Sequence, residues 1–313
     1  MNQPLKINLT EELLELENFI IHRSCDIEQW FRTQWLENQA PFYGSVDLRN
    51  SGFKLAPVDM NLFPGGFNNL NPDFSPLAIQ ASSVAIEKVC PEAKRVLIIP
   101  EKHTRNLFYL KNLYQLKEIL KNSGLEVRIG SVDTSILEST NIDIDENQFI
   151  TIEPISRRED FLFLKNKDGT EFIPCSIILN NDLSGGVPEI IKNLGQQIIP
   201  PINAGWPTRK KSFHFHFYSQ VAKEFSILTN SDPWLIDPLS EKLDNLDFSA
   251  GEGEDRLVNT IDTLLGQIQK KYNEYNISQD PYVVVKANAG TYGMGVMTVK
   301  SSSEAINLNR KMR

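Results

Sequence analysis

A strand-helix-strand pattern in the middle of the chain limits the folds that it can adopt. Residues 95–100 form a short apolar run, residues 107–122 place apolar side chains at helical spacing, and residues 125–129 alternate. Gly124 stands where a helix is expected to end. Because two parallel strands need a crossover of this length, usually a helix, the pattern predicts a βαβ unit.

More strands are expected after this unit, at residues 149–152 and 176–180, with a hairpin turn at Lys167-Asp168-Gly169 between them. Strands that alternate with helices predict an α/β fold, with a three-layer domain and a partly parallel sheet. Ligands bind outside the carboxyl ends of such strands, which makes residues 101–106 and 181–182 candidates for a site. His103 and Arg105 are a candidate carboxylate-binding pair there, and helix capping by the same turn is the alternative.

A second pattern near the end of the chain indicates phosphate binding. Two β-type runs, at residues 283–285 and 296–299, flank a loop with Gly290, Gly293 and Gly295, and Lys286 ends the first run. Glycines let backbone N–H groups approach a polyphosphate closely, and a lysine adds a point charge. A P-loop or a dinucleotide fingerprint would continue into a helix, whereas a second strand is expected here. An ordinary glycine-rich hairpin is the alternative.

The stretch from Pro41 to Pro76 is rich in glycine, proline and asparagine, and we expect it to be a long loop. Long loops inside compact domains are usually functional. This one carries side chains that hold carboxylates or amides, and we interpret it as a substrate-binding loop with Arg49, Lys54, Asn61, Asn68 and Asn69. The alternative is that the asparagines only stabilise turns.

The remaining helices and motifs are less specific. Helices are predicted from Thr10, over 218–228 and over 254–275. His214 and His216 would share one face of a strand and could share a metal ion, but buried histidines are the more frequent outcome. The basic triplet at 209–211 is either a phosphate or substrate contact or a solvated turn.

Composition excludes several classes of protein. A formal net charge of -8 gives no electrostatic footprint for nucleic acid or an anionic membrane surface. No apolar run approaches the roughly 18 residues of a membrane span, and the N-terminus lacks a signal-peptide pattern. Cys25, Cys90 and Cys175 are too widely spaced for a disulfide framework or a zinc knuckle. We therefore expect a cytoplasmic protein whose partners are small molecules. The sequence does not indicate its oligomeric state.

Three segments together resemble the proteobacterial glutamate-cysteine ligase family of ATP-grasp type: residues 286–299, residues 46–50 with 53–70, and residues 103–106. The resemblance runs through nearly the whole chain, although Asn288 stands where we would expect an aspartate. It implies that ATP phosphorylates the γ-carboxylate of L-glutamate and that the amine of L-cysteine attacks the acyl phosphate. The product would be γ-glutamylcysteine, in the first step of glutathione synthesis. Positioning and charge neutralisation would do most of the catalytic work.

The same resemblance implies a domain plan and site residues. Residues 1–205 would form a pre-ATP-grasp-like substrate-binding domain, and residues 206–313 a helical segment with an incomplete first ATP-grasp lobe. Lys286, Arg49 and Arg105 would be catalytic. ATP, used with Mg²⁺, would be held by Lys286, Gly290, Thr291, Tyr292, Gly293, Met294 and Gly295. The amino-acid substrates would be held by Arg49, Lys54, Asn61, Asn68, Asn69, His103 and Arg105.

The end of the chain raises a question about completeness. After Lys286 the sequence contains one carboxylate side chain, that of Glu304, so the magnesium ligands stay unknown. An independent domain usually takes about 100–150 residues, and the stretch after Pro281 is far shorter. We therefore expect this chain to be an inactive fragment of a longer enzyme. Two alternatives stay open: another ATP-grasp amino-acid ligase, such as one like glutathione synthetase, and a non-catalytic nucleotide- or amino-acid-binding protein.

Overall fold

The structure is a computed structural model, and it describes residues 9–102, 106–145, 148–247, 251–289 and 296–306. The chain divides into two compact units. Unit 1 comprises residues 1–29, 48–59 and 210–313, and unit 2 comprises residues 30–47 and 60–209. The sequence predicted two consecutive domains, at 1–205 and 206–313. The observed division differs because the N-terminal helix and residues 48–59 group with the C-terminal part.

Unit 2 is built on a six-stranded sheet with the strand order β11-β10-β3-β4-β6-β5. The strands from β11 to β6 are parallel, and β5 is antiparallel to β6. The predicted βαβ unit is confirmed, with α4 (Leu107–Asn122) as its crossover. The strands are β3 (Arg95–Pro100), β4 (Glu126–Ser131), β5 (Thr140–Asp145), β6 (Gln148–Pro154), β10 (Ser176–Asn180) and β11 (Gln197–Ile199).

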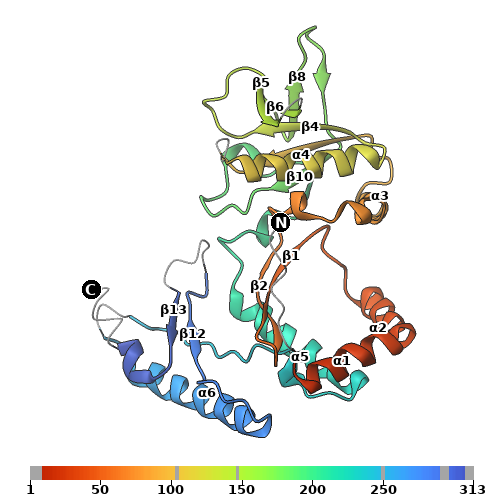
Figure 1. The fold of residues 1–313 in the computed structure, drawn as a ribbon. Helices are drawn as coiled ribbons and strands as arrows, with labels where there is room; N and C mark the ends of the chain where they lie inside the picture. Colours follow the sequence, from red (N-terminus) through yellow and green to blue (C-terminus); the bar gives the residue numbers. More distant parts are fainter. Residues whose placement is uncertain (1–8, 103–105, 146–147, 248–250, 290–295, 307–313) are drawn as a thin grey trace. The chain divides into compact units, whose positions relative to one another are not determined.

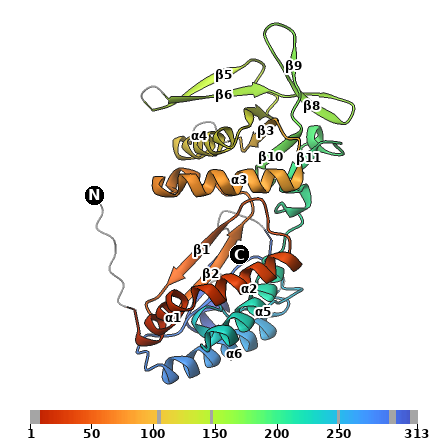
Figure 2. The ribbon, with the colours of Figure 1, turned by 90° about the vertical axis from the view of Figure 1, so that its right-hand side faces the viewer.

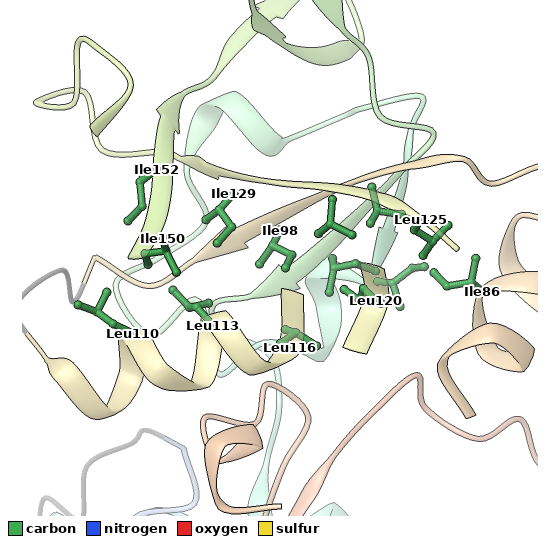
Figure 3. Close-up of a cluster of buried hydrophobic side chains, with 14 of the residues drawn as sticks. Ile86, Ile98, Leu110, Leu113, Leu116, Leu120, Leu125, Ile129, Ile150 and Ile152 are labelled. Carbon is green, nitrogen blue, oxygen red and sulfur yellow. The ribbon is translucent and has the colours of Figure 1, made fainter. Parts of the chain in front are cut away.

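Helices cover one face of this sheet. The apolar stripe of α4 packs on alternate residues of the strands, and α3 (Ser75–Val89) adds Ile86 to the same core. Figure 3 shows Leu113 and Leu116 of α4 facing Ile98 and Ile150 of the sheet. These side chains are almost completely buried, which is why the apolar spacing of this helix was readable from the sequence.

The other face of the sheet carries strands and 3-10 turns where the three-layer prediction placed helices. Its core joins Leu97 and Ile177 of the large sheet to Leu162, Leu164 and Phe172 of a small one. The cover consists of β7 (Ser156–Arg158), β8 (Phe161–Lys165), β9 (Glu171–Phe172), η3 (Glu189–Ile191) and η4 (Ile202–Ala204). The α/β class is confirmed, but the third layer comes from a meander (Figure 2).

Unit 1 combines helices with the predicted glycine-loop hairpin, which is confirmed. Val283 pairs with Val299 and Val285 with Met297 in antiparallel register, next to α6 (Figure 1). A small core of Leu257, Ile261, Val299 and Ala305 holds the hairpin to α6. The elements are α1 (Glu11–His22), α5 (Lys211–Thr229), η5 (Pro233–Leu235), α6 (Glu254–Glu274), β12 (Val283–Val285) and β13 (Met297–Val299).

Three elements contain residues of both units, and two of them are strands that the sequence did not predict. The stretch from Pro41 to Pro76 is not a structureless loop, because it contains two paired strands and two 3-10 turns. These are β1 (Ser45–Asn50), β2 (Leu55–Asn61), η1 (Phe67–Asn69) and η2 (Pro72–Phe74), and the third boundary element is α2 (Ser24–Glu37). Pro57 and the scattered polar residues hid the strands from a reading based on alternation.

The shared face considered for His214 and His216 required a strand, but both residues lie near the start of α5. Residues two positions apart on a helix point about 200° apart, so the two imidazoles do not share a face. Helix α5 begins at Lys211, seven positions before the predicted start at Tyr218. None of the described helices is both long enough and apolar enough to cross a bilayer.

Candidate functional site

The first candidate site lies at the carboxyl ends of β3 and β10 in unit 2. The chain leaves β3 for β4 on one side and later returns to β10 on the other side, so a topological switch point falls between β3 and β10. Crevices at such points are the usual ligand sites of open α/β sheets. Glu101 follows β3, and Asn181 and Asp182 follow β10, as the sequence predicted.

Hydrogen bonds join these two strand ends. The backbone N–H of Asp182 donates to Oε1 of Glu101 at 2.6 Å, and Nδ2 of Asn181 donates to the carbonyl of Pro100 at 3.1 Å. The hydroxyl of Tyr109, from α4, accepts from the N–H of Glu101 at 2.8 Å and lies 2.9 Å from the carbonyl oxygen of Asn180. The edge is therefore a cross-linked polar surface.

Buried amide side chains stabilise this edge of the sheet through hydrogen bonds. Asn112 is fully buried in the apolar face of α4, and its Nδ2 donates to Oδ1 of Asn180 at 3.2 Å. Its own Oδ1 accepts from the N–H of Phe67, which fixes the start of η1. Tyr109, Asn112 and Asn180 were not predicted as site residues from the sequence. The signal was present, because Asn112 interrupts a stripe of leucines at a core-facing position, and buried amides need partners.

The pKa of the Glu101 carboxyl is raised to about 7. Burial is the largest cause and the negative charge of Asp182 acts in the same direction, while the hydrogen bond from the N–H of Asp182 lowers the pKa. A carboxyl that titrates near neutrality can bind an amine or exchange a proton. Burial also raises the pKa of the Tyr109 hydroxyl well above its usual value, so this group stays protonated.

The second candidate site is the root of the hairpin in unit 1. Nζ of Lys286 donates to the carbonyl of Val58 in β2 at 2.5 Å and lies 4.9 Å from the ring centroid of Phe215 in α5. Phe215 is buried, and the ammonium is thus positioned by a carbonyl and an aromatic face. Two elements therefore fix the direction of the lysine predicted to contact phosphate.

Lys54 of the predicted substrate loop packs into the core of unit 1. Its ammonium lies 4.5 Å from the ring centroid of Trp234. Its pKa is lowered to about 8, mainly by burial; the charge of Lys271 acts in the same direction, and the charges of Asp237 and Asp232 oppose it. Such a lysine has a charge that is easily lost, and it lies beside an aromatic cluster of Phe53, Trp234 and Tyr272.

The other members of that loop have different surroundings. Arg49 is exposed in β1. In unit 2, the amide of Asn61 accepts from the N–H of Phe63 at 2.8 Å and donates to the carbonyl of the same residue at 3.1 Å. Nδ2 of Asn68 donates to Oδ1 of Asn69 at 3.2 Å. These local bonds are typical of asparagines that stabilise turns, which was the alternative interpretation.

Several predicted site residues lie outside the part of the chain that the structure describes. They are His103 and Arg105 of the carboxylate-binding pair and the loop residues Gly290, Thr291, Tyr292, Gly293, Met294 and Gly295. Their neighbour Asn106 is described, and its Oδ1 caps α4 by accepting from the N–H groups of Phe108 and Tyr109.

A magnesium ion has no evident ligand set in the described ranges. Within them, no three histidine, cysteine, aspartate or glutamate side chains gather as a metal site would require. Mg²⁺ is usually held by one or two carboxylates together with phosphate oxygens and water. The described residues therefore do not define a metal site, and we assign no residue to the ion.

Comparisons with known proteins identify the family. The family model for glutamate-cysteine ligase matches residues 17–313. Among solved structures, a crystal structure of a candidate γ-glutamylcysteine synthetase from Methylobacillus flagellatus KT is similar, with 54% sequence identity and a TM-score of 0.91. The match covers 99% of this chain and 72% of that chain. A comparison with curated proteins found no significant match.

Proposed function

Because the chain belongs to the glutamate-cysteine ligase family, we propose that it serves the ATP-dependent joining of L-glutamate to L-cysteine. In this reaction the γ-carboxylate attacks the terminal phosphorus of ATP, which gives an acyl phosphate and ADP. The cysteine amine then attacks the acyl carbon, phosphate leaves, and an amide forms. The partners are small molecules, and a cytoplasmic location stays an expectation.

The observation that carries the proposal is the position of Lys286 at the root of the β12–β13 hairpin. Two antiparallel strands hold the ends of the glycine-rich loop, and the lysine ends the first strand. We propose that ATP phosphates replace the Val58 carbonyl as the partner of this ammonium, since an anionic phosphate oxygen attracts the ammonium more strongly than a neutral carbonyl oxygen does. Lys286 and residues 290–295 would then hold the nucleotide.

Substrate amino acids need groups that bind carboxylates and amines. We propose Arg49 and Arg105 for carboxylates, because a guanidinium binds a carboxylate through two parallel hydrogen bonds. The other residues that we propose to bind the amino-acid substrates are His103, Lys54, Asn61, Asn68 and Asn69. The ammonium of Lys54 packs against Trp234, and the amides of Asn61, Asn68 and Asn69 form local hydrogen bonds in turns. These four side chains therefore have less freedom to reach a ligand.

We also propose that the hairpin and its supporting helices correspond to the first part of an ATP-grasp domain. In such folds the nucleotide lies between two lobes, and the second lobe normally supplies the magnesium ligands. Magnesium would neutralise charge on the transferring phosphoryl group when bound.

The test is ADP release from Mg-ATP by the purified chain, with glutamate present and with cysteine present or absent, together with the equilibrium binding of both ATP and glutamate. We expect binding of both ligands. Glutamate-dependent ADP release that increases when cysteine is added would support the ligase reaction. ADP release that depends on an acceptor amino acid other than cysteine would favour the alternative of another ATP-grasp amino-acid ligase. A folded chain that does not bind ATP would contradict the proposed function.

A further inference from the structure

The N-terminus of α5 lacks a cap from its own sequence. The residue at the N-cap position is Lys210, which gives no side-chain hydrogen bond to the helix, and Lys211 follows it. Serine, threonine, aspartate and asparagine are the residues that normally fill this position. Two lysines also place positive charge at the positive end of the helix dipole. The start of this helix is therefore unfavourable as a local structure.

The missing cap comes from Asn288, three residues after β12. Its carbonyl oxygen accepts from the N–H of Lys211 at 2.9 Å, and its Oδ1 accepts from the N–H of Ser212 at 2.9 Å. The first two N–H groups of α5 are thus satisfied by one residue that is 76 positions away from Ser212. Because the main chain and the side chain of Asn288 are both bonded, its backbone position and its rotamer are fixed together.

Lys286 contacts the same helix from two positions earlier. Its ammonium lies over Phe215, which is one turn after Lys211, and donates to the carbonyl of Val58. Lys286 and Asn288 therefore hold the segment between β12 and the glycine-rich loop against the first turns of α5. This segment enters the loop that the proposed function assigns to ATP phosphates.

We propose that Asn288 is a positioning residue for the nucleotide: by capping α5 from a distance, it sets the place from which Lys286 reaches the phosphates. This inference rests on the proposed function. It also explains why an aspartate would suit the position. A carboxylate offers the same acceptor to Ser212 and adds attraction to the helix N-terminus and to Lys210 and Lys211.

A cap that only stabilised the helix would affect folding and leave nucleotide affinity unchanged. The two roles are separated by three variants. Asn288→Ala removes the side-chain acceptor, and Asn288→Asp retains one. Asn71→Ala is the matched control, since Oδ1 of Asn71 caps η2 by accepting from the N–H of Asp73 at 3.0 Å in unit 2.

The experiment measures the dissociation constants of Mg-ATP and of glutamate for each variant of the full chain. Loss of a helix cap corresponds to a change of about fivefold to tenfold in an equilibrium constant. We expect Asn288→Ala to weaken ATP binding by about that factor with glutamate binding unchanged. Asn288→Asp and Asn71→Ala should bind ATP within about twofold of the unaltered chain. Equal ATP affinity for Asn288→Ala and the unaltered chain would overturn the inference. A loss of ATP affinity in Asn288→Asp as large as that in Asn288→Ala would also overturn it.

Hydrogen exchange of the ligand-free protein separates failure of this inference from failure of the proposed function. If the unaltered chain binds no ATP, the proposed function fails. In either case Asn288→Ala should speed amide exchange in peptides covering residues 211–217 and 283–289, while Asn71→Ala should not. Unchanged exchange in those peptides would show that Asn288 does not hold this segment, whatever the ATP result.

Discussion

At the scale of single residues, Glu101 shows how position in the fold changes chemistry. Its carboxyl follows β3 and accepts the N–H of Asp182, and it is close enough to the carboxylate of Asp182 to feel its charge. An exposed glutamate would be ionised throughout the neutral range. Here burial brings the pKa to about 7, so small changes of pH near neutrality change the charge of the edge between β3 and β10.

This raised pKa predicts a pH-dependent stability. The folded protein keeps the Glu101 proton up to about pH 7, whereas the unfolded chain loses it near pH 4.5. The favourable contribution is therefore complete below pH 4.5 and is lost as the pH rises through 7. Glu101→Gln keeps an oxygen acceptor for Asp182 and carries no charge. We expect its unfolding free energy to exceed that of the unaltered protein by about 1–2 kcal/mol at pH 8, after allowance for partial exposure.

Urea unfolding of both proteins at pH 4.5 and pH 8 measures this effect. The difference between the two proteins should grow between these two pH values. A difference that is the same at both would show that ionisation of Glu101 carries no penalty in the folded state.

At the scale of elements, the sequence predicted those whose signals are local. The βαβ unit and α6 show apolar periodicity over many residues, and the hairpin shows β-branched runs around glycines. The first turns of α5 were missed because their cap comes from Asn288, which no local pattern reveals. For the same reason the hairpin site was predictable as a motif, while the contacts of Lys286 to Val58 and Phe215 were not.

Two glycines inside elements should respond oppositely to the same substitution. A Cβ on Gly130 in β4 would lie 2.6 Å from Cγ1 of Ile155, in a tightly packed place. A Cβ on Gly266, in the middle of α6, would meet nothing within 4 Å. We expect Gly130→Ala to cost about 1–3 kcal/mol of stability and Gly266→Ala to add about 0.5–1 kcal/mol.

Chemical denaturation of the two glycine variants tests the packing of these elements. A Gly130→Ala protein as stable as the unaltered one would contradict the close approach of Ile155 to β4. A loss of stability in Gly266→Ala would contradict the exposed helical position of that residue in α6.

At the scale of the whole molecule, the chain does not divide where its sequence suggested. Unit 1 is assembled from residues 1–29, 48–59 and 210–313, so its core joins Leu13 and Phe53 to Trp234 and Tyr272. Each of these segments shows ordinary local patterning, and nothing in any one of them names its distant partner. The family resemblance indicated a function that the local patterns alone did not. It draws on nearly the whole chain, and the family model matches residues 17–313.

The central claim is that the hairpin of unit 1 holds ATP through Lys286. Equilibrium binding of Mg-ATP to the unaltered chain, to Lys286→Ala and to Lys300→Ala tests it most directly. Lys300 follows β13 of the same hairpin, and its ammonium pairs with the exposed carboxylate of Asp280 at 3.0 Å, so its replacement matches the change in charge and costs little stability. We predict that Lys286→Ala weakens ATP binding by roughly tenfold or more, while Lys300→Ala binds within about twofold of the unaltered chain. Equal ATP affinity for Lys286→Ala and Lys300→Ala would contradict the claim.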